Sequence, residues 1–263
     1  MLVVDEAQHD AAMSMANLHG EVKPQKILGL SATPYRHDRI KLCFQHVIRD
    51  ADIFYLVQSG YLSRYRHFTI GKYDPQSVAE CYAREPERWG QSLIFFHRKE
   101  KCVQCAHHLE QHGVKAEVVT AQTDREQQIE DFVSGKTQVL LSMMILTEGF
   151  DCPSLETVFC RPSGKACTIQ MGGRVLRTHP EISHKQIVQC RDTRCPFPRV
   201  ATPDEQYTWS ETGWKSLKLN PHLAEISQNT LNVIAQAEVK LPEFLSKKRR
   251  QTNFWNQQNN PNF

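Results

Sequence analysis

No stretch of the sequence is apolar for long enough to cross a membrane, and Asp5 and Glu6 interrupt the apolar run at the N-terminus. The nine cysteines are odd in number and follow no regular spacing, which argues against a disulfide framework. The formal net charge is only +3, too small by itself to indicate a nucleic-acid partner. We therefore expect a soluble, cytoplasmic protein with reduced thiols and no membrane partner. Its 263 residues can form one or two domains.

The sequence also lacks a phosphate-binding loop. Residues 134–137 (SGKT) match the end of the G-x-x-x-x-G-K-T pattern, but Glu130 stands where the first glycine should be. That glutamate falls inside a predicted helix, and a predicted strand follows the segment instead of preceding it. Both contexts are wrong for a loop that cradles phosphates.

A possible metal site is equally incomplete. Cys102, Cys105 and His108 have the spacing of zinc ligands, but they lie within a predicted helix at 98–112. On a helix these side chains wind around the axis, and no second pair of ligands lies nearby in the sequence. We expect no zinc.

Apolar runs alternate with helical patterns along the chain, which predicts a parallel α/β sheet. Predicted helices lie at residues 11–18, 38–59, 98–112 and 124–134. The predicted strands lie at residues 1–4, 26–30, 64–70, 92–96, 114–120, 139–141, 157–160 and 185–190.

An array of polar residues follows the predicted strand at 157–160. If the chain is helical from Ile169, the side chains of Gln170, Arg174 and Arg177 share one face. Two neighbouring guanidinium groups suit a polyphosphate, whose charge is spread over several oxygens. The alternative is a solvated basic face. Gly172 and Gly173 argue against it, because glycine destabilises a helix by about 1 kcal/mol unless a close approach requires it.

Two further polar segments follow predicted strands near the N-terminus. Asp5-Glu6-Ala7-Gln8 lies at the carboxyl end of the strand at 1–4, where two carboxylates could hold a divalent metal and a water molecule. Acidic residues are also common in the first turn of a helix, so the residues alone leave both readings open. Ser31-Ala32-Thr33-Pro34 follows the strand at 26–30, and an ordinary turn would explain it in isolation.

Taken in order, these segments resemble motifs of the DEAD/DEAH-box type in superfamily 2 DNA and RNA helicases, a group that includes subunits of type III restriction enzymes. The resemblance covers residues 2–177 and rests on DEAQ, SAT, the turn TEGFD at 147–151 and QxxGRxxR. It implies two RecA-like domains, ATP and Mg²⁺ as cofactors, and DNA or RNA as the partner.

The resemblance also implies a role for each matching residue. Asp5 would hold Mg²⁺, Glu6 would activate the attacking water, and Gln8 would connect the nucleotide site to the neighbouring motifs. Ser31 and Thr33 would couple hydrolysis to domain movement. Arg174 and Arg177 would stabilise the transferring γ-phosphoryl group. The residues expected to approach the nucleotide are Gly149, Asp151, Gln170 and Gly173.

These expectations define a domain plan. Residues 1–72 would be part of a first RecA-like domain, 73–90 a linker and 91–200 the second RecA-like domain. Residues 201–245 would form a helical extension, and 246–263 a disordered tail. We expect an N-terminal half with the phosphate-binding loop to be missing, which would leave this chain inactive alone. The alternatives are a non-hydrolytic nucleic-acid-binding module and a translocase on double-stranded DNA.

Overall fold

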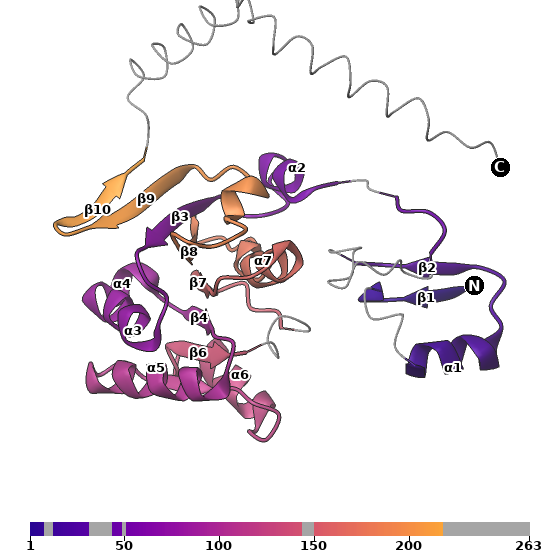
Figure 1. Ribbon diagram of the computed structural model, residues 1–263, viewed down its shortest axis with the longest axis horizontal. Helices are drawn as coiled ribbons and strands as arrows, with labels where there is room; N and C mark the ends of the chain where they lie inside the picture. The colour runs from indigo at the N-terminus through magenta and orange to yellow at the C-terminus, as the bar shows by residue number, and fades with distance from the viewer. Residues whose placement is uncertain (8–12, 32–43, 49–50, 144–149, 218–263) are drawn as a thin grey trace, which may run out of the picture. The chain divides into compact units, whose positions relative to one another are not determined.

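The computed structural model describes residues 1–7, 13–31, 44–48, 51–143 and 150–217 (Figure 1). Four predictions fall outside these ranges: the roles of Gln8, Thr33 and Gly149, and the tail at 246–263. None of the helices in the described ranges is long and apolar enough to cross a membrane.

The N-terminal part contains a parallel pair of strands. β1 (Leu2–Val4) pairs with β2 (Ile27–Gly29), and α1 (Met13–Val22) lies between them in the sequence. Gly29 is required by close packing, because a Cβ atom there would lie 2.4 Å from the ring of Phe44 and 2.8 Å from the Cβ of Ala7. The two predicted strands are therefore confirmed.

The second sheet has eight strands in the order β10-β9-β3-β8-β7-β4-β6-β5. β9 and β10 pair antiparallel, and the other neighbouring strands pair parallel. The predicted parallel α/β fold is thus confirmed. The strands are β3 (Tyr65–Ile70), β4 (Ser92–Phe95), β5 (Ala116–Val118), β6 (Val139–Ser142), β7 (Thr157–Cys160), β8 (Lys185–Cys190), β9 (Glu205–Ser210) and β10 (Gly213–Ser216).

Apolar side chains are buried on both faces of this sheet, as expected for parallel strands. Along β4, Leu93 and Phe95 belong to one core cluster and Ile94 to the other. The first cluster includes side chains from α6 (Arg125–Val133) and α7 (Lys165–Gly173). The second includes side chains from α3 (Pro75–Arg84), α4 (Pro86–Trp89) and α5 (Lys99–Gln111).

The predicted boundary at residue 72 and the linker at 73–90 are wrong. β3 lies between β8 and β9 inside the large sheet, so it is not part of the N-terminal strand pair. The predicted linker contains α3 and α4, whose buried side chains pack in the core. Pro75 and Pro86 look like linker residues in the sequence. Each occupies the start of a helix, where the missing N–H costs nothing.

The predicted helical extension at 201–245 is wrong for its first part. Residues 205–216 form the hairpin β9–β10, in which Trp209 and Trp214 are directly paired. The sequence analysis predicted no strand after residues 185–190, but β9 and β10 follow β8. A long helix predicted at 38–59 is reduced, in the described ranges, to α2 (Ile53–Gln58).

Candidate functional site

The Asp5–Glu6 pair lies in a tight bend directly after β1. The Asp5 carboxylate accepts a hydrogen bond from the Glu6 amide at 2.8 Å. Glu6 has a φ angle of +48°, a left-handed conformation that non-glycine residues adopt mainly at turns and functional sites. The bend lets the Ala7 amide bond to the carbonyl of Leu30 at 2.9 Å. Asp5 is exposed and Glu6 half-exposed, so the segment presents carboxylate oxygens to solvent.

Ser31 lies at the same edge of this strand pair. The amide of Leu30 donates to the carbonyl of Val4 at 2.8 Å, so the carboxyl ends of β1 and β2 are adjacent. The structure therefore brings together Asp5, Glu6 and Ser31, which are about 25 residues apart in the sequence.

The second group of predicted residues lies where α7 ends. The α-helix stops at Gly173, residues 174–176 form a 3₁₀ turn (η3), and Arg177 is extended. The prediction that Gln170, Arg174 and Arg177 share one α-helical face is therefore wrong, because the winding changes before Arg177 is reached. Gln170 lies on α7 and is half-buried.

Both arginines nevertheless contact one short segment. Arg174 donates from Nη1 to the carbonyl of Phe150 at 3.0 Å, and Arg177 forms an ion pair from Nε to Asp151 at 3.4 Å. Phe150 is buried in the core and anchors this segment. Asp151 and Arg177 are more than half exposed, which makes their ion pair weak and open to competition.

The two glycines of α7 have different environments. A Cβ at Gly172 would lie 2.3 Å from the ring of Phe197, whereas a Cβ at Gly173 would meet nothing within 4 Å. The close approach inferred from the sequence is thus real at Gly172, but the neighbour is a core side chain rather than a ligand. Gly173 has open space beside it.

Ser63 and Lys185 support the arginine segment, and sequence reasoning missed both. Ser63 bonds through its amide to the carbonyl of Leu176 at 2.8 Å and through its hydroxyl to the carbonyl of Arg177 at 3.0 Å. Lys185 is fully buried and donates to the carbonyls of Pro153 and Leu155, each at 2.6 Å. A lysine within the apolar run KQIVQC was the available signal.

Burial lowers the pKa of Lys185 to about 8, and the charge of Glu156 partly offsets that effect. The ammonium group lies in a dry setting where two carbonyl acceptors replace water. Through these two hydrogen bonds, Lys185 connects β8 to residues 153–155, which follow Asp151.

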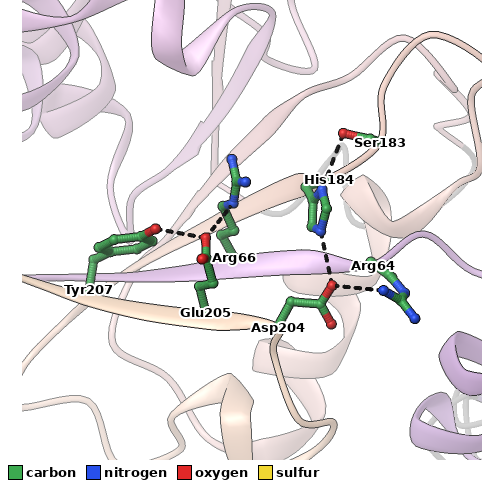
Figure 2. Close-up of polar contacts among 7 residues, drawn as sticks. All are labelled: Arg64, Arg66, Ser183, His184, Asp204, Glu205 and Tyr207. Atoms are coloured by element: carbon green, nitrogen blue, oxygen red, sulfur yellow. Dashed lines mark hydrogen bonds and ion pairs between the residues drawn. The ribbon is translucent and has the colours of Figure 1, made fainter. Parts of the chain in front are cut away.

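Polar and charged side chains also connect β3 and β9 with His184, the residue before β8. Figure 2 shows Asp204 between Arg64 and His184, at 3.5 and 2.9 Å. In the same view Glu205 contacts Arg66 at 2.9 Å and Tyr207 at 2.7 Å. These groups are partly exposed, so each pair contributes about 0–1 kcal/mol. They favour the register of β9 beside β3.

The Cys102 and Cys105 side chains belong to the core cluster rather than to a surface site. Burial raises the pKa of the Cys102 thiol to about 11 and raises that of Cys105 further. Such thiols stay protonated, and a protonated thiol is a poor metal ligand. In the described ranges, no three His, Cys, Asp or Glu side chains are grouped as a metal site.

Residues 75–179 match the helicase conserved C-terminal domain. A 51.5 kDa protein of a Lactococcus phage is 23% identical over 82% of this chain and 54% of its own length. The Saccharomyces cerevisiae protein named "Putative ATP-dependent helicase IRC3" is 26% identical over 72% of this chain and 33% of its own length. The chain thus spans about half or less of the length of these relatives.

A solved structure shows the same fold. It is Saccharomyces cerevisiae Dbp5 bound to RNA and ADP BeF3, with 17% identity and a TM-score of 0.53. The match covers 79% of this chain and 58% of Dbp5. At this identity the likeness concerns the fold alone. The chain is therefore similar to the helicase conserved C-terminal domain over residues 75–179, to a relative named as a helicase in sequence, and to Dbp5 in fold.

Proposed function

We propose that this chain provides the nucleotide-responsive and nucleic-acid-binding C-terminal part of an ATP-dependent helicase. The contact of Arg174 and Arg177 with residues 150 and 151 is the observation that carries the proposal. It gathers two permanent cations and a carboxylate at one place, on elements held by buried contacts. Such a site suits a polyphosphate whose charge changes during phosphoryl transfer.

The two arginines have different roles in this proposal. Arg174 is fixed by its bond to the Phe150 carbonyl and acts as a preset donor. Arg177 is held by an exposed carboxylate, and a phosphate group with more negative charge competes for its guanidinium. The exchange of Asp151 for phosphate would make the position of Arg177 depend on bound nucleotide. Gly149, Gln170 and Gly173 would complete the approach to the nucleotide.

The N-terminal group would serve the same nucleotide. Carboxylate oxygen is the ligand type that Mg²⁺ prefers, and Mg²⁺ commonly binds one or two carboxylates together with substrate phosphates. The exposed carboxylate of Asp5 fits that use, and the ion would neutralise phosphate charge. Glu6 would orient the attacking water. Gln8, Ser31 and Thr33 would relay the state of the site to the rest of the protein.

Turnover requires a phosphate-binding loop, and the 263-residue sequence contains none. We infer that the loop comes from additional sequence or from another chain. The same observation favours a second candidate, a non-hydrolytic module that binds DNA or RNA. Relatives named as helicases and the Dbp5 structure with RNA support nucleic acid as a partner in both cases.

The test compares Arg174→Ala, Arg177→Ala and Arg177→Lys in a preparation in which a domain with a phosphate-binding loop completes the site. We expect each alanine variant to lower kcat by about 10³-fold or more, with ATP affinity largely retained, because such arginines act on charge that develops in the transition state. Lysine should rescue poorly, since it lacks the planar fork.

Arg199→Ala, which removes an exposed arginine outside this group, serves as the matched control. Near-parental turnover in both alanine variants would remove Arg174 and Arg177 from the active site. Normal nucleic-acid binding without any turnover in the completed preparation would instead favour the non-hydrolytic module.

A further inference from the structure

We infer that single-stranded nucleic acid extends beyond the matched domain onto the outer strands β8, β3 and the β9–β10 hairpin. Its phosphates contact Lys72 and Arg191, and one base occupies a cleft beside Trp209. This inference rests on the proposed nucleic-acid binding and adds a path for the strand outside residues 75–179.

The first observation is a row of cations at the carboxyl edge of the sheet. Basic residues follow β4 (Arg98), β8 (Arg191) and β3 (Lys72) within three residues of the strand end. β3 and β8 end at the same height, because their last residues, Ile70 and Cys190, are paired and the Arg191 amide bonds to the Ile70 carbonyl at 2.9 Å. Because β8 and β7 lie between them, β3 and β4 are three strand spacings apart, or about 14 Å.

These cations are free to bind an external anion. Lys72, Arg98 and Arg191 are exposed, and within the part of the chain that the structure describes none of them has a carboxylate partner. Asp192 adjoins Arg191 and offsets one of the charges. Asp74, two residues after Lys72, is engaged at the start of α3, where it accepts bonds from the Ser77 amide and hydroxyl at 2.9 Å each.

The second observation is a cleft at the end of this row. It has a volume of about 210 Å³ and lies between the end of β3, α3 and the hairpin. The Arg84 guanidinium lies 4.8 Å from the centre of the Trp209 ring. The residues that line the cleft include Ile70, Lys72, Cys81, Arg84, Trp209 and Trp214.

The chemistry of the cleft suits a flat, uncharged ring. Its carboxylates are engaged, because Glu80 pairs with Arg84 at 3.7 Å and Glu85 accepts from Arg88 at 2.6 Å and from Trp214 at 3.2 Å. Indole and guanidinium planes are the surfaces on which nucleic-acid bases stack. Lys72 belongs both to the cleft and to the row of cations, so a base in the cleft would have its phosphate at the edge.

The experiment measures anisotropy of labelled oligothymidylate and oligouridylate with the 263-residue chain across a salt series. We expect Lys72→Ala and Arg191→Ala each to weaken binding at low salt. Each should also reduce the slope of log K against log salt by about 0.7, the value for one lost phosphate contact on a single strand. Lys115→Ala is the matched control, because Lys115 is an exposed lysine immediately before β5, at the opposite edge.

Trp209→Ala should weaken binding about tenfold or more with an unchanged salt slope, because stacking is not ionic. Trp209→Phe keeps an aromatic ring and should retain most of the affinity, which separates lost stacking from a damaged fold. Comparing the two oligonucleotides shows whether DNA or RNA is preferred.

Each further outcome has a defined meaning. If the parent binds and the Lys72, Arg191 and Trp209 variants match the Lys115 variant, the outer path is wrong while nucleic-acid binding by the core stands. If the parent binds neither oligonucleotide at low salt, both this inference and the proposed nucleic-acid binding fail.

Discussion

The buried histidine of β3 links this fold to pH. His67 is 4% exposed, and its Nε2 hydrogen-bonds Gln189 at 3.0 Å. Its Nδ1 is buried and has no partner within the described ranges. Burial lowers the pKa of His67 to about 4, and the hydrogen bond to Gln189 offsets this only in part. The imidazole is therefore neutral in the folded protein at neutral pH.

We predict an acid-induced loss of stability from this residue. Well above pH 6.5 His67 is neutral in both the folded and the unfolded chain, so its protonation does not change the free energy of unfolding. Between pH 6.5 and 4 the unfolded chain takes up a proton that the folded chain does not, so the free energy of unfolding falls by about 2–3 kcal/mol. Urea unfolding at pH 7 and pH 4.5 should show a smaller loss for His67→Gln than for the parent. His112→Gln, at an exposed histidine, is the control. An equal loss of unfolding free energy in the parent and in His67→Gln would show that His67 does not cause the acid sensitivity.

At the residue scale, the sequence predicted the members of the site better than their supports. The motif spacing pointed to Asp151, Arg174 and Arg177. In the structure Arg177 pairs with Asp151, and Arg174 bonds to the carbonyl of the preceding residue, Phe150. Lys185 and Ser63 could not be predicted. Their partners lie about 30 and about 114 residues away along the chain, and only the pairing of distant strands brings them near. The assigned roles of the site residues remain predictions.

The two glycines at the end of α7 provide a matched pair at the scale of one element. Gly172→Ala should destabilise the protein by about 1–3 kcal/mol, because the added methyl group overlaps the ring of Phe197. Gly173→Ala should be neutral or stabilise by up to about 1 kcal/mol, because its site is open and alanine favours a helix. Thermal unfolding of both variants tests this contrast. Similar shifts in Tm for the two would contradict the packing account.

The wrong predictions about whole elements came from residue types that occur in more than one kind of structure. Proline marks both linkers and helix starts, and the sequence alone did not distinguish these uses at α3 and α4. The hairpin β9–β10 was not predicted because its aromatic residues pack against β3, which is distant in the sequence. Tyr207 stacks on Phe68 with ring centres 4.9 Å apart, and Trp214 meets Phe68 edge to face at 5.0 Å.

For the whole chain we predict negligible ATP hydrolysis by the 263-residue protein alone, with or without DNA or RNA. The reason is that no segment of the printed sequence has the full G-x-x-x-x-G-K-[ST] pattern, which would hold the β- and γ-phosphates. A sensitive phosphate-release assay should give the same background for the parent and for Glu6→Gln. Nucleic-acid-stimulated turnover by the parent, abolished in Glu6→Gln, would show that the chain completes a site by another route.

The class of the fold was predictable at this scale, but the order of the strands was not. Alternating apolar runs and helical patterns identified a parallel sheet, because that periodicity is local. The place of β3 between β8 and β9 depends on contacts between segments more than 100 residues apart, and no local pattern encodes them.

The central place of β3 has a consequence for how the protein is made. Among the strands of the eight-stranded sheet, β3 leaves the ribosome first, and its partner β8 is synthesised about 120 residues later. At 5–20 residues per second, β3 waits about 6–24 s with both edges unpaired and with Tyr65 and Phe68 uncovered. The nascent chain therefore carries an aggregation-prone strand while these 120 residues are synthesised, and a chaperone that shields residues 65–70 should raise the yield of folded protein.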